Sequence, residues 1–338
     1  MNFKSDNTAT AAREILAALT AVNEQPAGAY GDDPWSRKLD EAFSALFERE
    51  VRVFTVASGT AANSIALASA VPPWGAILCH REAHIECDEC GAPEFFSGGA
   101  KLVLMDGEAA KVTPTALREA IARNARGIHS VQPAAVSISQ TTERGAVYRP
   151  EEVAALGEIA RAAKLAFHMD GARFANAVVS LRCKPADITW RAGVDLLSFG
   201  ATKNGALAAE SIVVFDLDRA EEVARRRKRG GHLFCKGRYP AAQFLAYLDN
   251  ELWLKLAGRA NALAAKLGEA AGPQLSLPVE SNQVFIKLGA AALAKLRAAD
   301  AEFYDWGGES AGEARLVVSW NQDEAEVDRL CALLRALR

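Results

Sequence analysis

Apolar runs rich in β-branched residues alternate along most of this chain with alanine-rich stretches of helical period, and this rhythm is the strongest constraint on its fold. Near-continuous apolar strands are typical of parallel sheets buried on both faces, where helices form the crossover connections. The pattern therefore predicts an α/β protein with a mostly parallel central sheet and helices on both faces. The candidate strands of this sheet lie at residues 51–56, 76–80, 101–106, 134–139, 165–170, 195–200 and 211–216.

This alternation of strands and helices changes towards the C-terminus. A long helix over 241–271 is followed by a strand at 283–288, a helix, a strand at 314–320 and a closing helix with an apolar stripe. We therefore divide the chain into a large domain, residues 1–239, and a small α+β domain, residues 240–338. No low-complexity linker separates them, so we expect the two parts to pack closely.

The composition argues against several classes of function. The chain has 338 residues, 50% of them hydrophobic, and a formal net charge of −3, which gives no long-range attraction towards nucleic acids or anionic membranes. Charged residues interrupt the N-terminal stretch, and no segment approaches the roughly 18 apolar residues of a membrane span. We expect a cytoplasmic protein whose six cysteines are reduced.

Three short motifs follow predicted strands at the carboxyl ends, where open parallel sheets bind their ligands. The first, VASGTAAN, places Ser58, Gly59 and Thr60 between a strand and a helix. A glycine there lets a ligand approach the backbone, and free N–H groups at the helix start favour a phosphate. Taken alone, this motif is more often an ordinary capped turn.

The second and third motifs carry charged side chains. HMDGARFAN places Asp170 at a strand end with Arg173 close behind it, and SFGATKNGA carries Lys203 out of a buried strand on a loop of small residues. The aspartate could keep a heterocyclic nitrogen protonated, and the arginine could bind a carboxylate with two hydrogen bonds. A partly desolvated lysine becomes an amine able to form a Schiff base. The simpler explanations are a capping aspartate paired with its arginine and a solvated lysine.

The order and spacing of the three motifs fit one ligand. About one strand–helix–strand unit separates Asp170 from Lys203, which brings both to the same edge of the sheet. A phosphate on residues 58–60, a ring nitrogen on Asp170 and an aldehyde on Lys203 together describe pyridoxal 5′-phosphate. The combined motifs therefore predict a site for this cofactor.

Over nearly its whole length the sequence resembles the L-threonine aldolase group of fold-type-I pyridoxal phosphate enzymes, which is related to the aromatic β-eliminating lyases. The motifs that carry the resemblance occur in the order KSDNTAT, AYGDDP, SGTAAN, EAHIE, HMDGARFANA, GATKNG and ARLVVSW. The resemblance implies a fold-type-I transferase-like fold and cleavage of L-threonine or L-allo-threonine into glycine and acetaldehyde. It also implies a homodimer or homotetramer with active sites shared between subunits.

The resemblance implies a role for each residue of the cofactor site. Lys203 would bond to the cofactor aldehyde, and Asp170 would partner the ring nitrogen. Gly59 and Thr60 would hold the phosphate. His84 would stack on the ring, and this histidine or a water that it orders would remove the proton of the substrate β-hydroxyl.

A second set of residues is implied to bind the substrate or a neighbouring subunit. Ser5, Arg173 and Arg315 would hold the substrate carboxylate, and Tyr30 would reach an active site at a subunit boundary. The basic run at 224–238 would supply groups to the cofactor phosphate of a neighbouring subunit, with Lys228, Lys236 and Arg238 as candidates. By composition this run is more simply a solvated helix end, and it is too short to indicate nucleic-acid binding.

Two features of the sequence leave alternatives open. Many relatives carry a histidine in the loop after the fourth predicted strand, where this chain has Glu143 and Arg144, so the β-hydroxyl base and the preferred aldehyde are undetermined. The products would distinguish an aldolase from a β-eliminating lyase or an aminotransferase of the same fold.

A zinc or nucleic-acid binding module is a more distant alternative. The stretch CHREAHIECDEC brings together two histidines and two cysteines, but its spacing is too compressed for the usual structural zinc site, and we expect no metal. The four residues are His80, His84, Cys87 and Cys90.

Overall fold

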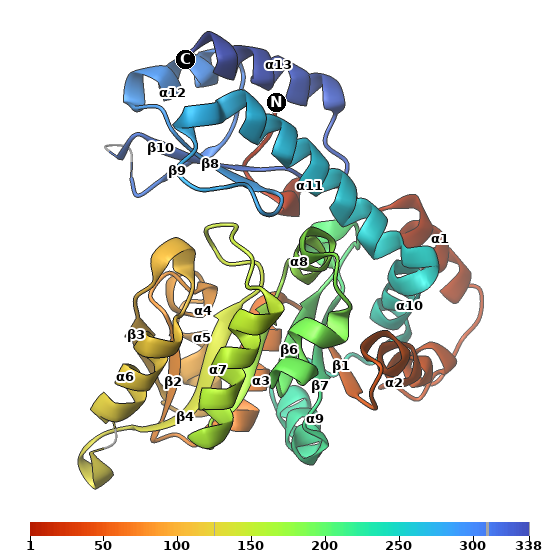
Figure 1. The fold of residues 1–338 in the computed structure, drawn as a ribbon. Helices are drawn as coiled ribbons and strands as arrows, with labels where there is room; N and C mark the ends of the chain where they lie inside the picture. The colour runs from red at the N-terminus through yellow and green to blue at the C-terminus, as the bar shows by residue number, and fades with distance from the viewer. Residues whose placement is uncertain (125, 309–310, 338) are drawn as a thin grey trace.

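The computed structural model describes residues 1–124, 126–308 and 311–337. Within these residues, a sheet of seven strands in the order β1-β7-β6-β5-β4-β2-β3 forms the middle of the molecule, and a sheet in the order β8-β10-β9 lies above it in Figure 1. The strands are β1 (Arg52–Val56), β2 (Gly75–His80), β3 (Lys101–Met105), β4 (Gln132–Ser139), β5 (Ala166–Gly171), β6 (Leu196–Gly200), β7 (Glu210–Val214), β8 (Gln283–Lys287), β9 (Tyr304–Trp306) and β10 (Glu313–Val317).

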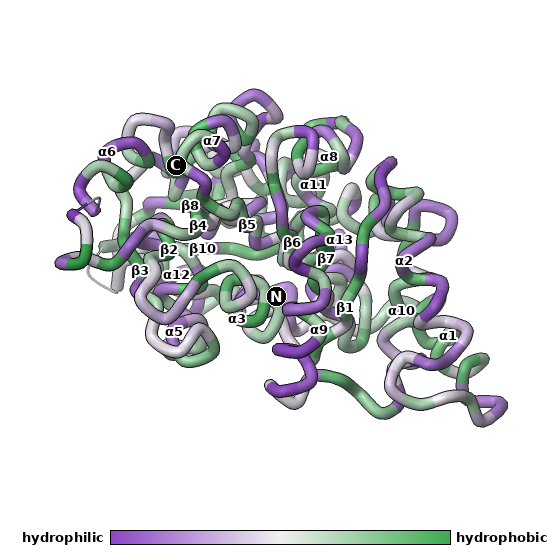
Figure 2. The backbone as a smooth tube through the Cα atoms, turned by 90° about the horizontal axis from the view of Figure 1, so that it is seen from below, coloured by the Kyte–Doolittle hydropathy of each residue, from purple (hydrophilic) through white to green (hydrophobic). Residues whose placement is uncertain are grey.

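The large sheet confirms the predicted α/β fold class and all seven expected strands. From β3 through β2, β4 and β5 to β6 the neighbours pair in parallel, and β7 runs antiparallel to both β6 and β1. Every residue of β2, β5, β6 and β7 is buried, as expected for strands covered on both faces. In the tube view of Figure 2, hydrophobic colour accordingly recurs along these central strands.

Helices cover both faces of this sheet. Along β2, Leu78 packs into the cluster that contains Val153 of α7, whereas Ile77 and Cys79 pack into the cluster that contains Leu67 of α3. The α-helices are α1 (Arg13–Val22), α2 (Pro34–Phe47), α3 (Gly59–Ala70), α4 (His84–Cys87), α5 (Ala92–Ser97), α6 (Pro114–Asn124), α7 (Pro150–Ala162), α8 (Phe174–Leu181), α9 (Ala220–Arg229), α10 (Arg238–Leu248), α11 (Leu252–Ala271), α12 (Ala290–Ala298) and α13 (Glu324–Ala336).

Short 3₁₀ helices complete the described secondary structure. They are η1 (Asp6–Thr8), η2 (Glu108–Ala110), η3 (Gly127–His129), η4 (Pro185–Ile188), η5 (Trp190–Ala192), η6 (Thr202–Asn204), η7 (Leu217–Arg219), η8 (Asp249–Glu251) and η9 (Gly272–Gln274). Across the described ranges, no helix combines the length and apolarity needed to cross a membrane.

The single helix expected over 241–271 is in fact two helices, α10 and α11. Asn250 and Glu251 between them take φ values of 50° and 56°, in the left-handed region that a right-handed helix cannot contain. The break lets α10 pack against α1 and α2, while α11 runs on to the small sheet (Figure 1).

The N-terminal segment packs with the C-terminal sheet. Phe3 is fully buried in the same apolar cluster as residues of α11, β8, β10 and α13, and its carbonyl accepts a hydrogen bond of 2.8 Å from the N–H of Val317. Asn2 forms a β-bridge with Glu302. Phe3 therefore belongs to the core of the small sheet, and the division at residues 239 and 240 stays a prediction.

Candidate active site

A pocket opens at the carboxyl ends of the large sheet, where β1, β2, β4, β5 and β6 each pass into a loop or helix. Lys203, Asp170, His84 and Gly59, which are far apart in the sequence, all line it, so the structure brings together the central residues predicted from the three motifs. The full lining is Gly59, Asn63, His84, Ser139, Thr141, Glu143, Asp170, Ala172, Arg173 and Lys203.

Asp170 stays ionised at the end of β5. Its carboxylate accepts hydrogen bonds from Asn63 Nδ2 at 2.8 Å and from the backbone N–H of Ala172 at 3.0 Å. Burial alone would raise the pKa of Asp170, but the charge of His84, the Ala172 N–H and the charge of Lys203 outweigh it and lower the pKa. The pocket therefore holds a buried anion facing the lysine.

Asn63 and Glu89 tie His84 to this anion. The Nδ2 of Asn63 donates to Glu89 Oε1 as well as to Asp170, and His84 Nδ1 lies 2.8 Å from the same Glu89 oxygen. The hydrogen bond to Glu89 raises the pKa of His84, and burial raises the pKa of Glu89. Both directions fit one proton held between the two groups, which fixes the imidazole ring beside Asp170.

Lys203 follows β6 on the 3₁₀ turn η6. The neighbouring Asn204 anchors this turn, because its Nδ2 donates to the Tyr247 hydroxyl at 2.6 Å and to the Trp253 carbonyl at 2.9 Å. Burial, followed by the like charge of Arg173, lowers the pKa of Lys203. A lower pKa increases the fraction of uncharged amine, which is the nucleophilic form.

The start of α3 provides unpaired backbone donors beside the lysine. Ser58 caps the helix, with its Oγ accepting from the N–H of Ala61 at 3.2 Å and its carbonyl accepting from the N–H of Ala62 at 3.0 Å. In the part of the chain that the structure describes, no group accepts from the N–H of Gly59 or Thr60. These donors, at the positive end of the helix dipole, can bind an anion.

Two arginines, Arg173 at the start of α8 and Arg315 on β10, lie close enough for their charges to interact, and only Arg173 is among the described residues that line the pocket. Arg173 donates to the buried carboxylate of Asp6 through Nε at 2.8 Å and Nη2 at 3.0 Å, and Asn282 donates to the same carboxylate at 3.0 Å. Arg315 on β10 has a buried Nε without a partner. Burial and the charge of Arg173 lower the pKa of Arg315. Two guanidinium groups that repel each other can be stabilised by an anion between them.

The other predicted binding residues lie outside this pocket. Ser5 caps η1, with its Oγ accepting from the Asn7 N–H at 3.2 Å. Tyr30 is 55% exposed, and Lys228 Nζ lies 4.8 Å from the centre of its ring. Lys236 is exposed, and the guanidinium of Arg238 lies over the Tyr239 ring. None of these side chains lines the pocket among the described residues.

The first three arginines of the basic run at 224–238 are paired within this chain. Arg225 and Arg226 form ion pairs with Glu221 and Glu222 one turn earlier in α9. Arg227 donates to the carbonyl and hydroxyl oxygens of Thr55. This part of the run is a helix end, as the simpler explanation predicted.

Glu143 and Arg144, which share one loop, face different surroundings. The guanidinium of Arg144 pairs with Glu313 at 2.9 Å and lies over the Phe285 ring at 4.5 Å, both in the small sheet. Glu143 lines the pocket. Neither Glu143, Asn63, Glu89 nor Asp6 was assigned a role from the sequence.

The histidines and cysteines of residues 79–90 do not converge. His80 Nε2 lies 3.1 Å from the Gly107 carbonyl, and Cys87 and Cys90 are exposed. The one group of possible metal ligands in the described ranges is His84, Glu89 and Asp170, which already contact each other or Asn63.

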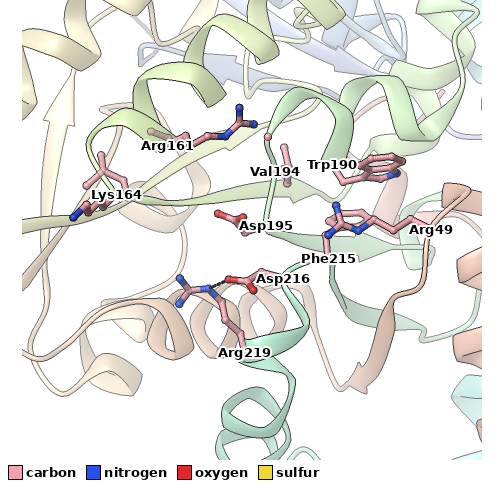
Figure 3. A pocket seen from close by; sticks show the side chains of 12 residues that line it. Arg49, Arg161, Lys164, Trp190, Val194, Asp195, Phe215, Asp216 and Arg219 are labelled. Atoms are coloured by element: carbon pink, nitrogen blue, oxygen red, sulfur yellow. Dashed lines mark hydrogen bonds and ion pairs between the residues drawn. The ribbon is translucent and has the colours of Figure 1, made fainter.

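A second hollow, of about 400 Å³, lies at the opposite ends of the strands (Figure 3). It is surrounded by Arg161, Lys164 and Arg219, with Asp195 in the middle and Asp216 paired to Arg219 at 2.9 Å. Open parallel sheets bind ligands at their carboxyl ends. This hollow adjoins the amino ends of β5 and β6, so the Lys203 pocket is the better candidate for chemistry.

Comparison with known families identifies the kind of protein to which this pocket belongs. The model of the β-eliminating lyase family matches residues 2–290. The chain belongs to the β-eliminating lyase family. This lyase-family chain is 42% identical, over 99% of its length, to a low specificity L-threonine aldolase of Pseudomonas aeruginosa, and it covers 96% of that protein.

Two further proteins are similar over almost the whole chain. A low specificity L-threonine aldolase of a Pseudomonas species is 41% identical over 99% of this lyase-family chain and is covered over 97% of its own length. The solved structure of a Leishmania major threonine aldolase superimposes with a TM-score of 0.93 at 30% identity, covering 99% of both chains.

Proposed function

We propose that this chain is a pyridoxal phosphate-dependent aldolase that cleaves L-threonine and L-allo-threonine to glycine and acetaldehyde. The observation that carries the proposal is the meeting of Lys203, Asp170 and the start of α3 in one pocket. Membership of a lyase family and similarity to named threonine aldolases over almost the whole chain support it. Other β-hydroxy amino acids, such as phenylserine, are further candidate substrates.

The groups in the pocket fit pyridoxal 5′-phosphate. The Lys203 amine can react with the cofactor aldehyde, and the ionised Asp170 can pair with the ring nitrogen. The unpaired N–H groups of Gly59 and Thr60, which follow the capping residue Ser58, can bind the phosphate. The aromatic ring of His84 would lie against the cofactor. When bound, this cofactor accepts the electron pair that bond cleavage leaves on the substrate Cα.

The arginine pair would bind the substrate. Arg173 and Arg315 together offer donors for one carboxylate, and Asp6 holds Arg173 in place. Fixing the carboxylate orients the rest of the amino acid in the pocket. Ser5 is one residue from Asp6 and stays a candidate for the same carboxylate.

Residues outside the pocket would serve a neighbouring subunit. Tyr30 contacts Lys228, and its N–H donates to the Cys235 carbonyl, one residue before Lys236. This gathering of groups, together with Arg238, supports a homodimer or homotetramer in which they reach a second active site. The oligomeric state and the cytoplasmic location stay predictions.

Replacing Lys203 by alanine tests the proposal. Lys203→Ala should abolish the visible absorbance of the bound cofactor and nearly all release of aldehyde, because no other amine lines the described pocket. Lys101→Ala, an exposed lysine at the start of β3, is the matched control and should keep both. A Lys203→Ala protein that keeps absorbance and turnover would refute the assignment.

The products separate the proposal from other enzymes of this fold. The unmodified protein should convert L-threonine to equal amounts of glycine and acetaldehyde without an added keto acid. Production of a keto acid and ammonia would instead indicate β-elimination, and a requirement for a keto acid would indicate an aminotransferase.

A further inference from the structure

Glu143 lies on the loop between β4 and α7, which reaches from the large sheet towards the small one (Figure 1). Two contacts with the small sheet hold this loop. Arg144 pairs with Glu313 of β10, and the carbonyl of Thr142 accepts from Gln283 of β8 at 3.2 Å. The Glu143 side chain is thereby placed over the pocket that contains Lys203.

The two carboxyl oxygens of Glu143 have different surroundings. Oε1 accepts from the Ser139 hydroxyl at 2.5 Å and from the backbone N–H of His84 at 2.9 Å, which orients the group. Oε2 is shielded from solvent and has no hydrogen-bond partner. A buried carboxyl oxygen without a partner is costly in a folded protein, and sites that keep such an atom often use it.

We propose that Glu143 removes the proton from the β-hydroxyl of the substrate when the aldehyde leaves. This inference rests on the aldolase activity proposed above and names a catalytic residue for it. A donor hydroxyl is the partner that Oε2 lacks, and a β-hydroxy amino acid bound between Lys203 and the arginines would bring one into the pocket.

The step conserves atoms and electrons. The hydroxyl O–H bond breaks, its proton passes to Glu143 Oε2, and its electron pair becomes the second C–O bond of the aldehyde. The Cα–Cβ bond breaks, its electron pair stays with Cα, and a proton then joins Cα to give glycine. Glu143 returns its proton to solvent, so the group is unchanged after each turnover.

His84 is the competing candidate for this role. Its Nδ1 is already engaged with Glu89, and the charge that this contact favours on the ring makes the imidazole a poorer proton acceptor. Arg144 is excluded because its guanidinium is held in the small sheet by Glu313 and Phe285.

The pKa of Glu143 suits the task. Burial raises it to about 7, against the opposing hydrogen bonds from Ser139 and His84, and the charge of Asp170 adds to the rise. A general base works best when its pKa lies near the working pH. The titratable or charged groups that face Glu143 from the surrounding elements are Asp170, His84, Cys79, Cys87, Tyr148, Lys203 and Arg173.

The test compares Glu143→Gln, Glu143→His and Glu86→Gln in the enzyme loaded with pyridoxal phosphate. Glu143→Gln should lower kcat/KM for aldehyde release by about 10²- to 10⁴-fold. Glu143→His, which supplies another base, should recover at least about 10-fold of this loss. Glu86 is an exposed acid on α4, and Glu86→Gln should match the unmodified enzyme.

Two further measurements separate a proton acceptor from a structural residue. In the unmodified enzyme, kcat/KM should fall as the pH drops below about 7, because protonated Glu143 cannot accept a proton, and Glu143→Gln should lose this dependence. Glycine has no β-hydroxyl, so Glu143→Gln should slow the exchange of its Cα hydrogens with deuterium oxide by less than about 10-fold. The absorbance of the bound cofactor should persist in Glu143→Gln.

The possible outcomes each decide the inference. Equal losses of aldehyde release and glycine exchange, or loss of bound cofactor, would make Glu143 a structural residue and overturn it. A fall of kcat/KM at low pH that persists in Glu143→Gln and disappears in His84→Ala would also overturn the inference. If the unmodified enzyme releases no aldehyde but exchanges glycine hydrogens, the proposed aldolase function has failed instead.

Discussion

Replacing Asp6 by asparagine removes the only anion that pairs with Arg173 among the described residues. Asp6 is 1% exposed and accepts two hydrogen bonds from Arg173 and one from Asn282. Breaking a buried ion pair by removing one partner costs about 3–5 kcal/mol, because the remaining charge stays buried. We therefore expect Asp6→Asn to lower the free energy of unfolding by about 3–5 kcal/mol near pH 7.

The pH dependence of this loss gives a second check. Burial alone would raise the pKa of Asp6, but the charges of Arg173 and Lys203 and the hydrogen bonds outweigh it and lower the pKa below 3.8. A carboxyl whose pKa is lower in the folded state stabilises the protein above its unfolded pKa and loses that contribution as the pH falls through its folded pKa. The stability difference between the two proteins should therefore shrink below about pH 4.

Urea unfolding followed by fluorescence measures both effects, with Asp33→Asn as the control. Asp33 is equally buried and caps α2 through Ser36, with no cation paired to it among the described residues. Asparagine caps helices about as well as aspartate, so this change should cost less than about 1 kcal/mol. An Asp6→Asn loss no larger than that of the control would refute the ion-pair reasoning.

Two other substitutions examine the groups around Asp170. His84→Ala should raise the Kd for pyridoxal phosphate by roughly 2- to 13-fold, since aromatic contacts contribute about 0.5–1.5 kcal/mol. An absorbance titration measures this Kd. A fall of about 10²-fold or more in aldehyde release, with the cofactor retained, would instead make His84 the base that removes the β-hydroxyl proton. Asn63→Ala should lower the free energy of unfolding by about 1–3 kcal/mol, because Glu89 and Asp170 each lose a buried donor. Unchanged urea unfolding would show that water replaces the amide.

The site residues at the strand ends were predictable from the sequence, but the side chains that pair with them were not. Asp170 and Lys203 follow recognisable buried strands, so the topology of a parallel sheet is enough to predict that they meet. Asn63 lies 107 residues from Asp170, and Asp6 lies 167 residues from Arg173. Pairings at such separations leave no local pattern, and KSDNTAT marked the Asp6 segment only through the family resemblance.

Local signals also failed where tertiary packing determined the backbone. No glycine or proline marks the break between α10 and α11, where Asn250 and Glu251 are left-handed and α10 packs against α1 and α2. The reversal of β7 was likewise invisible, because its apolar sequence suits a buried strand of either direction.

Arg173 follows a strand of the large sheet, and Arg315 lies on a strand of the small sheet. Asp6 pairs with Arg173 from the N-terminal segment, which packs with the small sheet. A ligand carboxylate bound by both arginines would link the two sheets for as long as the ligand stays bound. Ligand binding would then stabilise the packing of the two sheets, since a ligand that binds only this arrangement favours it by mass action.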